Sequence, residues 1–135
     1  MKGQLIKMTT IDLTISDIKF HDILAEMPIG QLKTEINDDI VNDYDIAILN
    51  INKLIGCIHD GYIYKKFVTD DKMIGLVKFI GQGHKLIPPI IRNIKGDSWT
   101  IIDGQHRIGL ILHIGISVMP FLIRKDQMKF IGKLQ

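Results

Sequence analysis

One short segment constrains this chain more than any other. Between Trp99 and Ile108, two apolar stretches flank the polar string Asp-Gly-Gln-His-Arg. The apolar residues before Asp103 predict a buried strand, and those after Arg107 predict a helix. A helix start presents backbone N–H groups without intrahelical partners at the positive end of the helix dipole, where anions bind. We therefore expect a strand, a tight Asp-Gly turn and a helix that begins with an anion site.

The same residues also have a purely structural interpretation. An Asp-Gly pair between two apolar runs is a strong β-hairpin signal, and the carboxylate of Asp103 can cap a helix that follows it. A turn alone, however, does not require the Gln-His-Arg that follows Gly104. Arg107 supplies a planar, permanently charged group that can bind phosphate through two parallel hydrogen bonds. The functional interpretation is a phosphate site, most often for a nucleotide, and the structural one stays open beside it.

Length and composition are those of one globular domain. With 46% hydrophobic and 24% charged residues, we predict a single domain over residues 1–135. The net charge of +2 is too small to indicate a nucleic-acid partner by itself. Residues 1–83 carry nine Lys and Arg against twelve Asp and Glu (−3), and residues 84–135 carry eight against three (+5). The positive half contains Arg107, which favours an anionic ligand.

No segment predicts export, membrane insertion or a metal site. Charges interrupt the N-terminal stretch, so it lacks the apolar core of a signal peptide. The most apolar run, residues 108–123, is too short for a membrane span. His106 and His113 are two helical turns apart, about 10 Å along the axis, which is too far to share one ion. We expect a cytoplasmic protein with no bound metal ligated by histidine or cysteine, with His113 in the core.

Periodicity and turn residues predict a mixed succession of strands and helices. Alternating apolar residues over 11–15 predict an early strand. Ser16 and Asp17 are then expected to cap a helical turn or short helix through Ile18, Ile23 and Leu24. Residues 46–58 are apolar enough for a helix or a buried strand, and periodicity does not decide between them. In the second half we expect helices over residues 73–80 and 105–114 and strands over residues 90–94, 98–102 and 118–123.

Local signals add three expectations. Gly83 and Gly115 are expected to end the two helices of the second half. Pro120 cannot donate to a ladder, so the last strand is expected at a sheet edge or with Pro120 among its first residues. The basic tail from Arg124 onward is expected to form a short helix or to fray.

From Met73 onward, the order of elements resembles the ParB/sulfiredoxin superfamily. The resemblance rests on a capped helix, a Gly-x-x-x-x-Pro-Pro-Ile strand, a hairpin, the string Asp-Gly-Gln-His-Arg, a helix ended by glycine and a final strand. That string is also the signature of DGQHR-domain proteins within the group. The similarity covers residues 13–15 and 69–124, somewhat under half of the chain. It implies an α+β fold with a small mixed sheet and helices, in which residues 30–67 form an insertion.

This resemblance implies a nucleotide site at the helix start. Gly104 lets the backbone approach phosphate, the amides near Gln105 cradle it, and Arg107 neutralises its charge. His106 would donate to a phosphate oxygen or assist a leaving group. Asp103 would orient a hydroxyl or hold Mg²⁺ through water. The implied cofactors are a nucleoside triphosphate (ATP or CTP) and Mg²⁺, and the implied reactions are nucleotide hydrolysis or phosphotransfer.

Departures from the family narrow these implications. Sulfiredoxins place their reactive cysteine where this chain has Gln105, and an amide cannot perform that chemistry, so sulfiredoxin activity is not expected. Partition-type ParB proteins carry DNA-binding and dimerisation modules after this domain, whereas a short tail follows Arg124. The alternative function is a non-catalytic regulatory module that contacts protein or DNA, the latter through Lys125, Lys129 and Lys133.

A few further residues receive local interpretations. His84, next to Lys85, either extends an anion site or is an ordinary loop histidine. The acidic residues over 35–45 lack a regular pattern and are expected in a solvated loop. Trp99 has no interleaved basic residues and is expected in the core, as is the lone Cys57. The partners considered are a nucleotide, DNA, another protein and a second copy of the chain in a homo-oligomer; a membrane is not among them.

Overall fold

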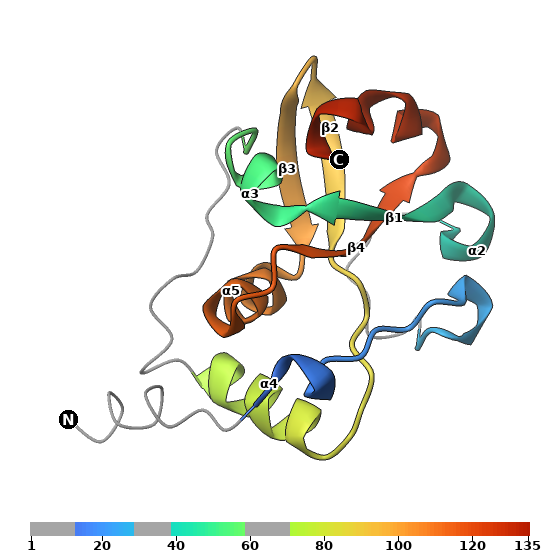
Figure 1. Ribbon diagram of the computed structural model, residues 1–135. Helices are drawn as coiled ribbons and strands as arrows, with labels where there is room; N and C mark the ends of the chain where they lie inside the picture. Colours follow the sequence, from blue (N-terminus) through green and yellow to red (C-terminus); the bar gives the residue numbers. More distant parts are fainter. Residues whose placement is uncertain (1–12, 29–38, 59–70) are drawn as a thin grey trace.

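The computed structural model describes residues 13–28, 39–58 and 71–135, which form a sheet with helices packed around it (Figure 1). This confirms the predicted α+β class. In chain order the elements, with η denoting a 3-10 helix, are η1 (Ile15–Asp17), η2 (Leu24–Glu26), α2 (Ile40–Asp43), β1 (Tyr44–Asn50), α3 (Ile51–Ile55), α4 (Asp71–Gly81), β2 (Ile90–Lys95), β3 (Ser98–Asp103), α5 (Gln105–Ile114), β4 (Val118–Arg124) and η4 (Lys125–Leu134).

The sheet is mixed and has the strand order β1-β4-β2-β3. β1 pairs with β4 in antiparallel orientation along its whole length. β2 and β3 form an antiparallel hairpin that turns at Gly96, where φ is +57. β2 meets β4 in parallel at the pair Ile90–Leu122. This single parallel contact joins the hairpin, which leads into α5, to the rest of the sheet.

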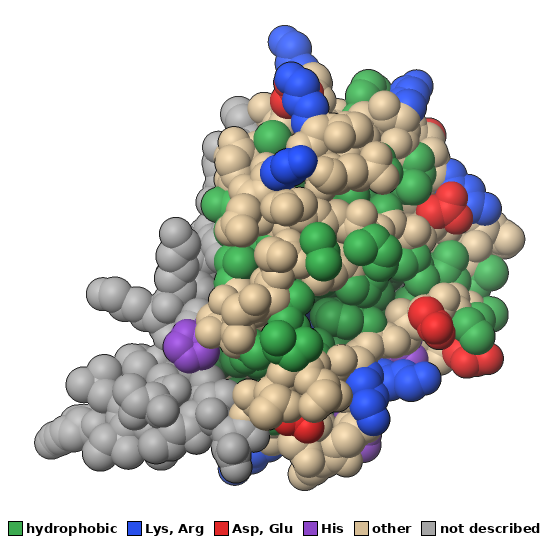
Figure 2. Space-filling model, viewed as in Figure 1, with side chains coloured by type: hydrophobic (Ala, Val, Ile, Leu, Met, Phe, Trp, Pro, Cys, Tyr) green, Lys and Arg blue, Asp and Glu red, His purple; other side chains and the backbone are tan. Residues whose placement is uncertain are grey.

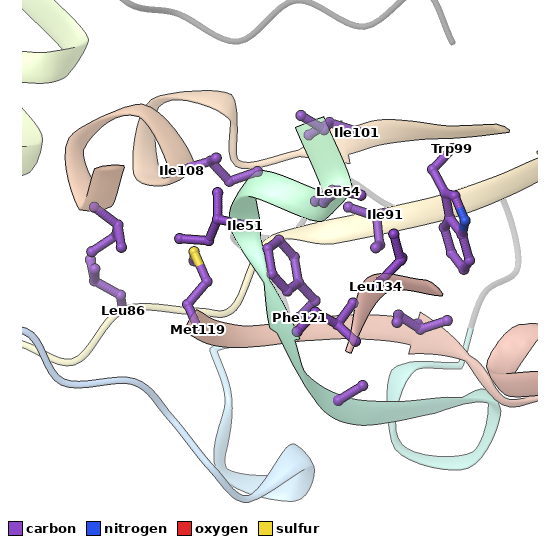
Figure 3. Packing of buried hydrophobic residues seen from close by; sticks show 14 of the residues in the cluster. Ile51, Leu54, Leu86, Ile91, Trp99, Ile101, Ile108, Met119, Phe121 and Leu134 are labelled. Carbon is purple, nitrogen blue, oxygen red and sulfur yellow. The ribbon is translucent and has the colours of Figure 1, made fainter. Parts of the chain in front are cut away.

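Buried side chains lie on both faces of the sheet. The larger cluster includes the apolar residues of α5 and one face of the strands, with Trp99 only 1% exposed (Figure 3). The core position predicted for Trp99 is thus confirmed. Leu122 lies between Phe121 and Ile123 and therefore points to the opposite face, where it joins a smaller cluster with Tyr44. Cys57, expected in the core, is half-buried at its margin.

The second half of the chain follows the sequence predictions closely. Both helices and all three strands expected there are present, with ends within two residues of those predicted. Gly83 (φ +87) and Gly115 (φ +105) end α4 and α5 in the left-handed conformation typical of helix C-termini.

β4 is an inner strand, so of the two expected placements the sheet edge is wrong. The other is confirmed, because Pro120 is the third residue of β4. The N–H of Leu122 donates to the carbonyl of Pro89 at 2.8 Å, where β2 joins β4. Successive N–H groups of a strand point alternately to its two sides. The nitrogen of Pro120, two residues before Leu122, therefore faces the β2 side of β4. Pro120 precedes the pair Ile90–Leu122 between β2 and β4, so its missing N–H costs no hydrogen bond between these strands.

Residues 39–58, the described part of the expected insertion over residues 30–67, contribute to the sheet and to the core. These residues supply β1 and α3, and the side chains of Leu49 and Leu54 are fully buried. The run 46–58, which periodicity left undecided, is a strand followed by a helix, and both bury apolar residues in the same cluster.

The early strand is also wrong for its described residues, because Ile15 begins η1 instead. The helical turn expected through Ile18, Ile23 and Leu24 is wrong as well, because η1 ends at Asp17 and Leu24 begins the separate η2. Thr14 rather than Ser16 is the N-cap of η1. The N–H of Thr14 donates to the carboxylate of Asp17 at 2.8 Å. A polar capping pair thus overrides the short apolar alternation.

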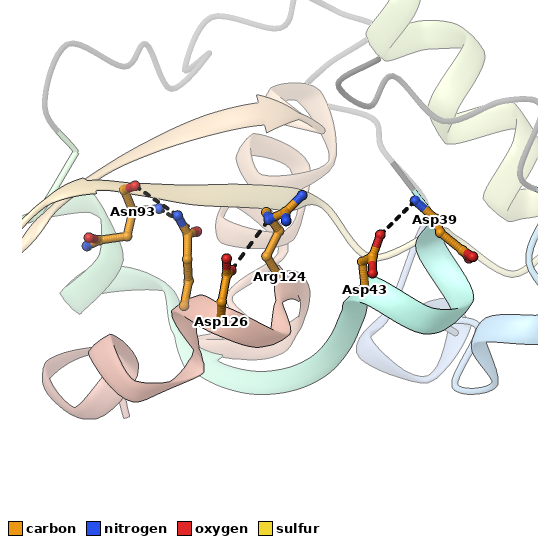
Figure 4. Close-up of polar contacts among 6 residues, drawn as sticks. Asp39, Asp43, Asn93, Arg124 and Asp126 are labelled. Carbon is orange, nitrogen blue, oxygen red and sulfur yellow. Dashed lines mark hydrogen bonds and ion pairs between the residues drawn. The ribbon is translucent and has the colours of Figure 1, made fainter. Parts of the chain in front are cut away.

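The C-terminal tail folds as η4, and hydrogen bonds of the Gln127 side chain connect it to Asn93 of β2 (Figure 4). The N–H of Asn93 donates to the side-chain oxygen of Gln127 at 3.0 Å, and the Gln127 amide donates to the carbonyl of Asn93 at 3.1 Å. The side chain replaces a neighbouring strand at this point of β2. Of the two alternatives considered for the tail, a short helix is confirmed.

We expect Gln127→Ala to lower the free energy of unfolding by about 1–3 kcal/mol, because it leaves two backbone groups of the buried Asn93 without partners. Urea denaturation followed by circular dichroism measures this change. Gln82→Ala, at an exposed position after α4, is the matched control. Equal stability of the two variants would show that the Gln127 bonds do not hold the tail.

Candidate functional site

The residues predicted to form a site lie at the junction of β3 and α5. Asp103 is the last residue of β3, Gly104 is the N-cap of α5, and the helix begins at Gln105. α5 lies between the sheet and α4 (Figure 1). The hairpin interpretation is therefore wrong, because the chain enters a helix after the turn. Gly104, rather than Asp103, occupies the N-cap position of α5.

Gly104 has a backbone conformation and surroundings that exclude a side chain. Its φ of +107 and ψ of 20 are left-handed, which is unfavourable for residues with a Cβ. A Cβ at this position would lie 2.6 Å from Cβ of Pro89 and 2.7 Å from Nη2 of Arg107. The absent side chain leaves the space in which Pro89 and the Arg107 guanidinium pack against the turn.

The first turn of α5 lines an open cleft. The N–H of Ile108 donates to the carbonyl of Gly104 at 3.0 Å, which is the first hydrogen bond of the helix. The N–H groups of Gln105, His106 and Arg107 precede this bond and therefore take no part in the hydrogen bonding within the helix. These three residues line a cleft of about 480 Å³ together with Asp103 and Gly104. The structure thus brings all five predicted site residues to one cleft.

Arg107 carries a charge that its surroundings balance only in part. Its side chain is 18% exposed, and Nη2 lies 3.7 Å from the carboxylate of Asp103, an ion pair longer than a hydrogen bond. Within the described ranges, no acceptor forms a hydrogen bond with the buried Nε or Nη2. Burial lowers the pKa of the Arg107 guanidinium, and Asp103 opposes this effect. Because the group stays charged at neutral pH, it favours an anion that supplies oxygen acceptors.

Lys72 belongs to the same cleft and was not predicted. It lies in the first turn of α4, one turn before Leu76, and both residues line the cleft. In the sequence, the only sign of this role is that Lys72 precedes the apolar Leu76 by one turn of the same predicted helix. No sequence pattern relates it to Arg107, because only the packing of α4 beside α5 brings the two side chains to one cleft.

A larger cleft of about 750 Å³ adjoins the first and shares Lys72, Leu76 and Arg107 with it. It also contains His84 and Lys85, so the proposed extension of an anion site at His84 has a place in the structure. Among the described residues that line this cleft there is no aspartate or glutamate. The absence of carboxylates favours anionic over cationic ligands here.

Other predicted features lie outside both clefts. His113 is exposed rather than in the core, because α5 buries the side that carries Ile108 and Ile111. The described acidic residues do not form a loop: Asp39 is the N-cap of α2, and its bonds from the side chain and N–H of Asn42 lower its pKa. In the described ranges no three His, Cys, Asp or Glu residues are grouped for a metal ion.

Comparisons of the chain with protein-family models, with curated proteins and with solved structures give no significant match. The resemblance to the ParB/sulfiredoxin superfamily therefore stays a prediction. In the part of the chain that is described, no helix is long and apolar enough to cross a membrane. The geometry and charge of the two clefts are the features that bear on function.

Proposed function

We propose that this protein binds a nucleotide, ATP or CTP, with its phosphate groups at the start of α5. The observation that carries this proposal is Arg107, whose Nε and Nη2 are buried without acceptors among the described residues. These donors lie beside the helix-start N–H groups, and phosphate oxygens accept from both kinds of donor. A phosphate would also supply negative charge that Asp103, 3.7 Å away, provides only in part.

Each residue of the smaller cleft has a role in this proposal. Gly104 keeps the turn open, and the N–H groups of Gln105 and His106 bind phosphate oxygens. The imidazole of His106 donates to a further oxygen or protonates a leaving group. Asp103 positions Arg107 and holds Mg²⁺ through water when the nucleotide brings it. Hydrolysis or transfer of the bound phosphoryl group is the reaction that such a site would support.

The nucleoside would extend into the larger cleft. That cleft is continuous with the phosphate site, because Lys72, Leu76 and Arg107 border both. Leu76 of α4 and Ile87 offer apolar surface against which a planar base can lie. The smaller cleft would then bind the phosphates and the larger one the organic part.

Lys72→Ala is expected to weaken nucleotide binding about tenfold, which is the effect of removing one charged contact worth roughly 1.4 kcal/mol. Lys78→Ala is the matched control, because Lys78 is an exposed lysine of the same helix that lines neither cleft. Isothermal titration calorimetry measures both affinities. Equal affinities would remove Lys72 from the site.

The proposal itself is tested by calorimetric titration of the wild-type protein with ATP, CTP, GTP and inorganic phosphate, with and without Mg²⁺. We expect at least one nucleoside triphosphate to bind more tightly than phosphate, because only a nucleotide fills both clefts. No binding of any nucleotide would contradict the proposal. Release of phosphate from the bound nucleotide then decides whether the site also turns it over.

The second candidate function is a non-catalytic protein-interaction module, and one surface favours it. Ile48 of β1 is 60% exposed and Val118 of β4 is 52% exposed. Hydrophobic side chains gather at the centre of the face that β1 and β4 occupy in this view (Figure 2). Contact with DNA through the tail has less support. Lys133 is paired with Asp97 at 2.7 Å, which raises the pKa of Lys133 but offsets its charge.

A further inference from the structure

The larger cleft runs along one face of α4. Its residues Lys72, Leu76 and Phe79 follow the i, i+4, i+7 spacing that places side chains on one helix face. Lys72 and Leu76 also line the smaller cleft, whereas Phe79 lines only the larger one. From Lys72 to Phe79 the helix rises about 10 Å. The larger cleft therefore extends from Arg107 toward the C-terminal end of α4.

A second group of polar donors lies at that far end. The ring of His84 stacks on Phe79, with ring centroids 4.5 Å apart and an interplanar angle of 22°. Lys85 follows His84 in the chain and lines the same cleft. Hydrogen bonds fix the neighbouring backbone, since the N–H of His21 donates to the carbonyl of Leu86 at 2.9 Å. This bond brings His21 to the cleft that His84 and Lys85 line.

Between the two ends the cleft is apolar. Leu76, Leu86 and Ile87 contribute to its walls, and no carboxylate side chain does so among the described lining residues. The cleft thus has the cationic side chains of Lys72 and Arg107 at one end, apolar walls in its middle, and Lys85 with two histidines at the other end. Such a distribution matches a ligand that carries negative charge at both ends of an apolar or planar body.

We infer that His21, His84 and Lys85 form a second anion subsite, which binds a phosphate or carboxylate group separate from the phosphates at Arg107. This inference rests on the proposed nucleotide site and extends it to a ligand class. Two sources of the second anion share this chemistry. One is a second phosphate on the same nucleotide, as in a nucleoside 3′,5′-bisphosphate, and the other is a small carboxylic acid bound beside the nucleotide.

Two calorimetric titrations separate these sources. The first compares a nucleoside 5′-monophosphate with the 3′,5′-bisphosphate of the same base. The second adds succinate, a simple dicarboxylate, to protein saturated with the 5′-monophosphate. We expect about tenfold tighter binding of the bisphosphate if the second anion belongs to the nucleotide, and binding of succinate if it belongs to a separate acid.

In either case Lys85→Gln should abolish binding of the second anion. The bisphosphate should then bind no more tightly than the monophosphate (an affinity ratio of about one), or succinate should no longer bind. Lys78→Gln, at an exposed position outside both clefts, should leave binding of the second anion intact. If neither anion binds in a Lys85-dependent way while the monophosphate still requires Arg107, the subsite is wrong and the nucleotide site stands. If the monophosphate binds independently of Arg107, or no nucleotide binds, both are overturned.

Discussion

Arg107→Ala is expected to weaken nucleotide binding about a hundredfold while leaving the protein folded. The substitution removes two charge-assisted donors from the phosphate site, each worth about 1.5 kcal/mol or more. In the protein without ligand, Nε and Nη2 are buried and have no acceptor among the described residues. Removing this buried cation relieves its desolvation cost, but it also takes the guanidinium away from the carboxylate of Asp103, 3.7 Å from Nη2. The two effects oppose each other, so we expect the free energy of unfolding to change little.

Calorimetry with the best-binding nucleotide and urea denaturation together measure these two effects. Arg107→Lys should lie between wild type and Arg107→Ala in affinity, because lysine keeps the charge but loses the planar pair of donors. Arg124→Ala is the matched control, since Arg124 pairs with Asp126 at 3.4 Å and lines neither cleft. Wild-type affinity in folded Arg107→Ala would mean that the start of α5 is not a phosphate site.

Gly104→Ala is expected to have the largest effect on stability, lowering the free energy of unfolding by about 2–4 kcal/mol. A left-handed conformation costs alanine roughly 1–2 kcal/mol. The added Cβ would also lie 2.6 Å from Cβ of Pro89 and 2.7 Å from Nη2 of Arg107. Relief of these contacts must move the turn or the guanidinium, so nucleotide affinity should fall together with stability.

Gly115→Ala separates the cost of the left-handed backbone conformation from the cost of the close contacts with Pro89 and Arg107. Gly115 has nearly the same backbone conformation as Gly104, with φ +105 and ψ 15, yet a Cβ there meets nothing within 4 Å in the described structure. Its substitution should cost only the conformational part, about 1–2 kcal/mol, and leave nucleotide affinity unchanged. Equal losses of stability in the two variants, measured by urea denaturation, would show that the contacts with Pro89 and Arg107 carry no cost.

The elements around the site could be predicted because their signals are local. The turn at Gly96, the Pro88-Pro89 pair and the glycines after each helix mark boundaries within a few residues of chain. The residues from Asp103 to Arg107 line one cleft because the end of the strand and the start of the helix follow each other directly in the chain.

The remaining features depend on contacts between distant segments. Nothing local indicates that β1 pairs with β4, or that Lys72 reaches the cleft of Arg107, because both result from packing across the chain. The ion pair of Asp103 with Arg107 was likewise missed. The two residues are only four apart, so this local pair, which joins the end of β3 to the first turn of α5, could have been predicted from the sequence.

The most direct test of the central claim is an NMR titration of the ¹⁵N-labelled protein with ATP and with CTP. If the start of α5 binds nucleotide phosphates, the largest shift changes should occur at the backbone amides of Gln105, His106 and Arg107 and at the Nε–H of Arg107, with saturation at one equivalent. Shift changes confined to η4, or to the exposed residues of β1 and β4, would contradict it. A titration in which neither nucleotide moves the signals of the α5 start would contradict it as well.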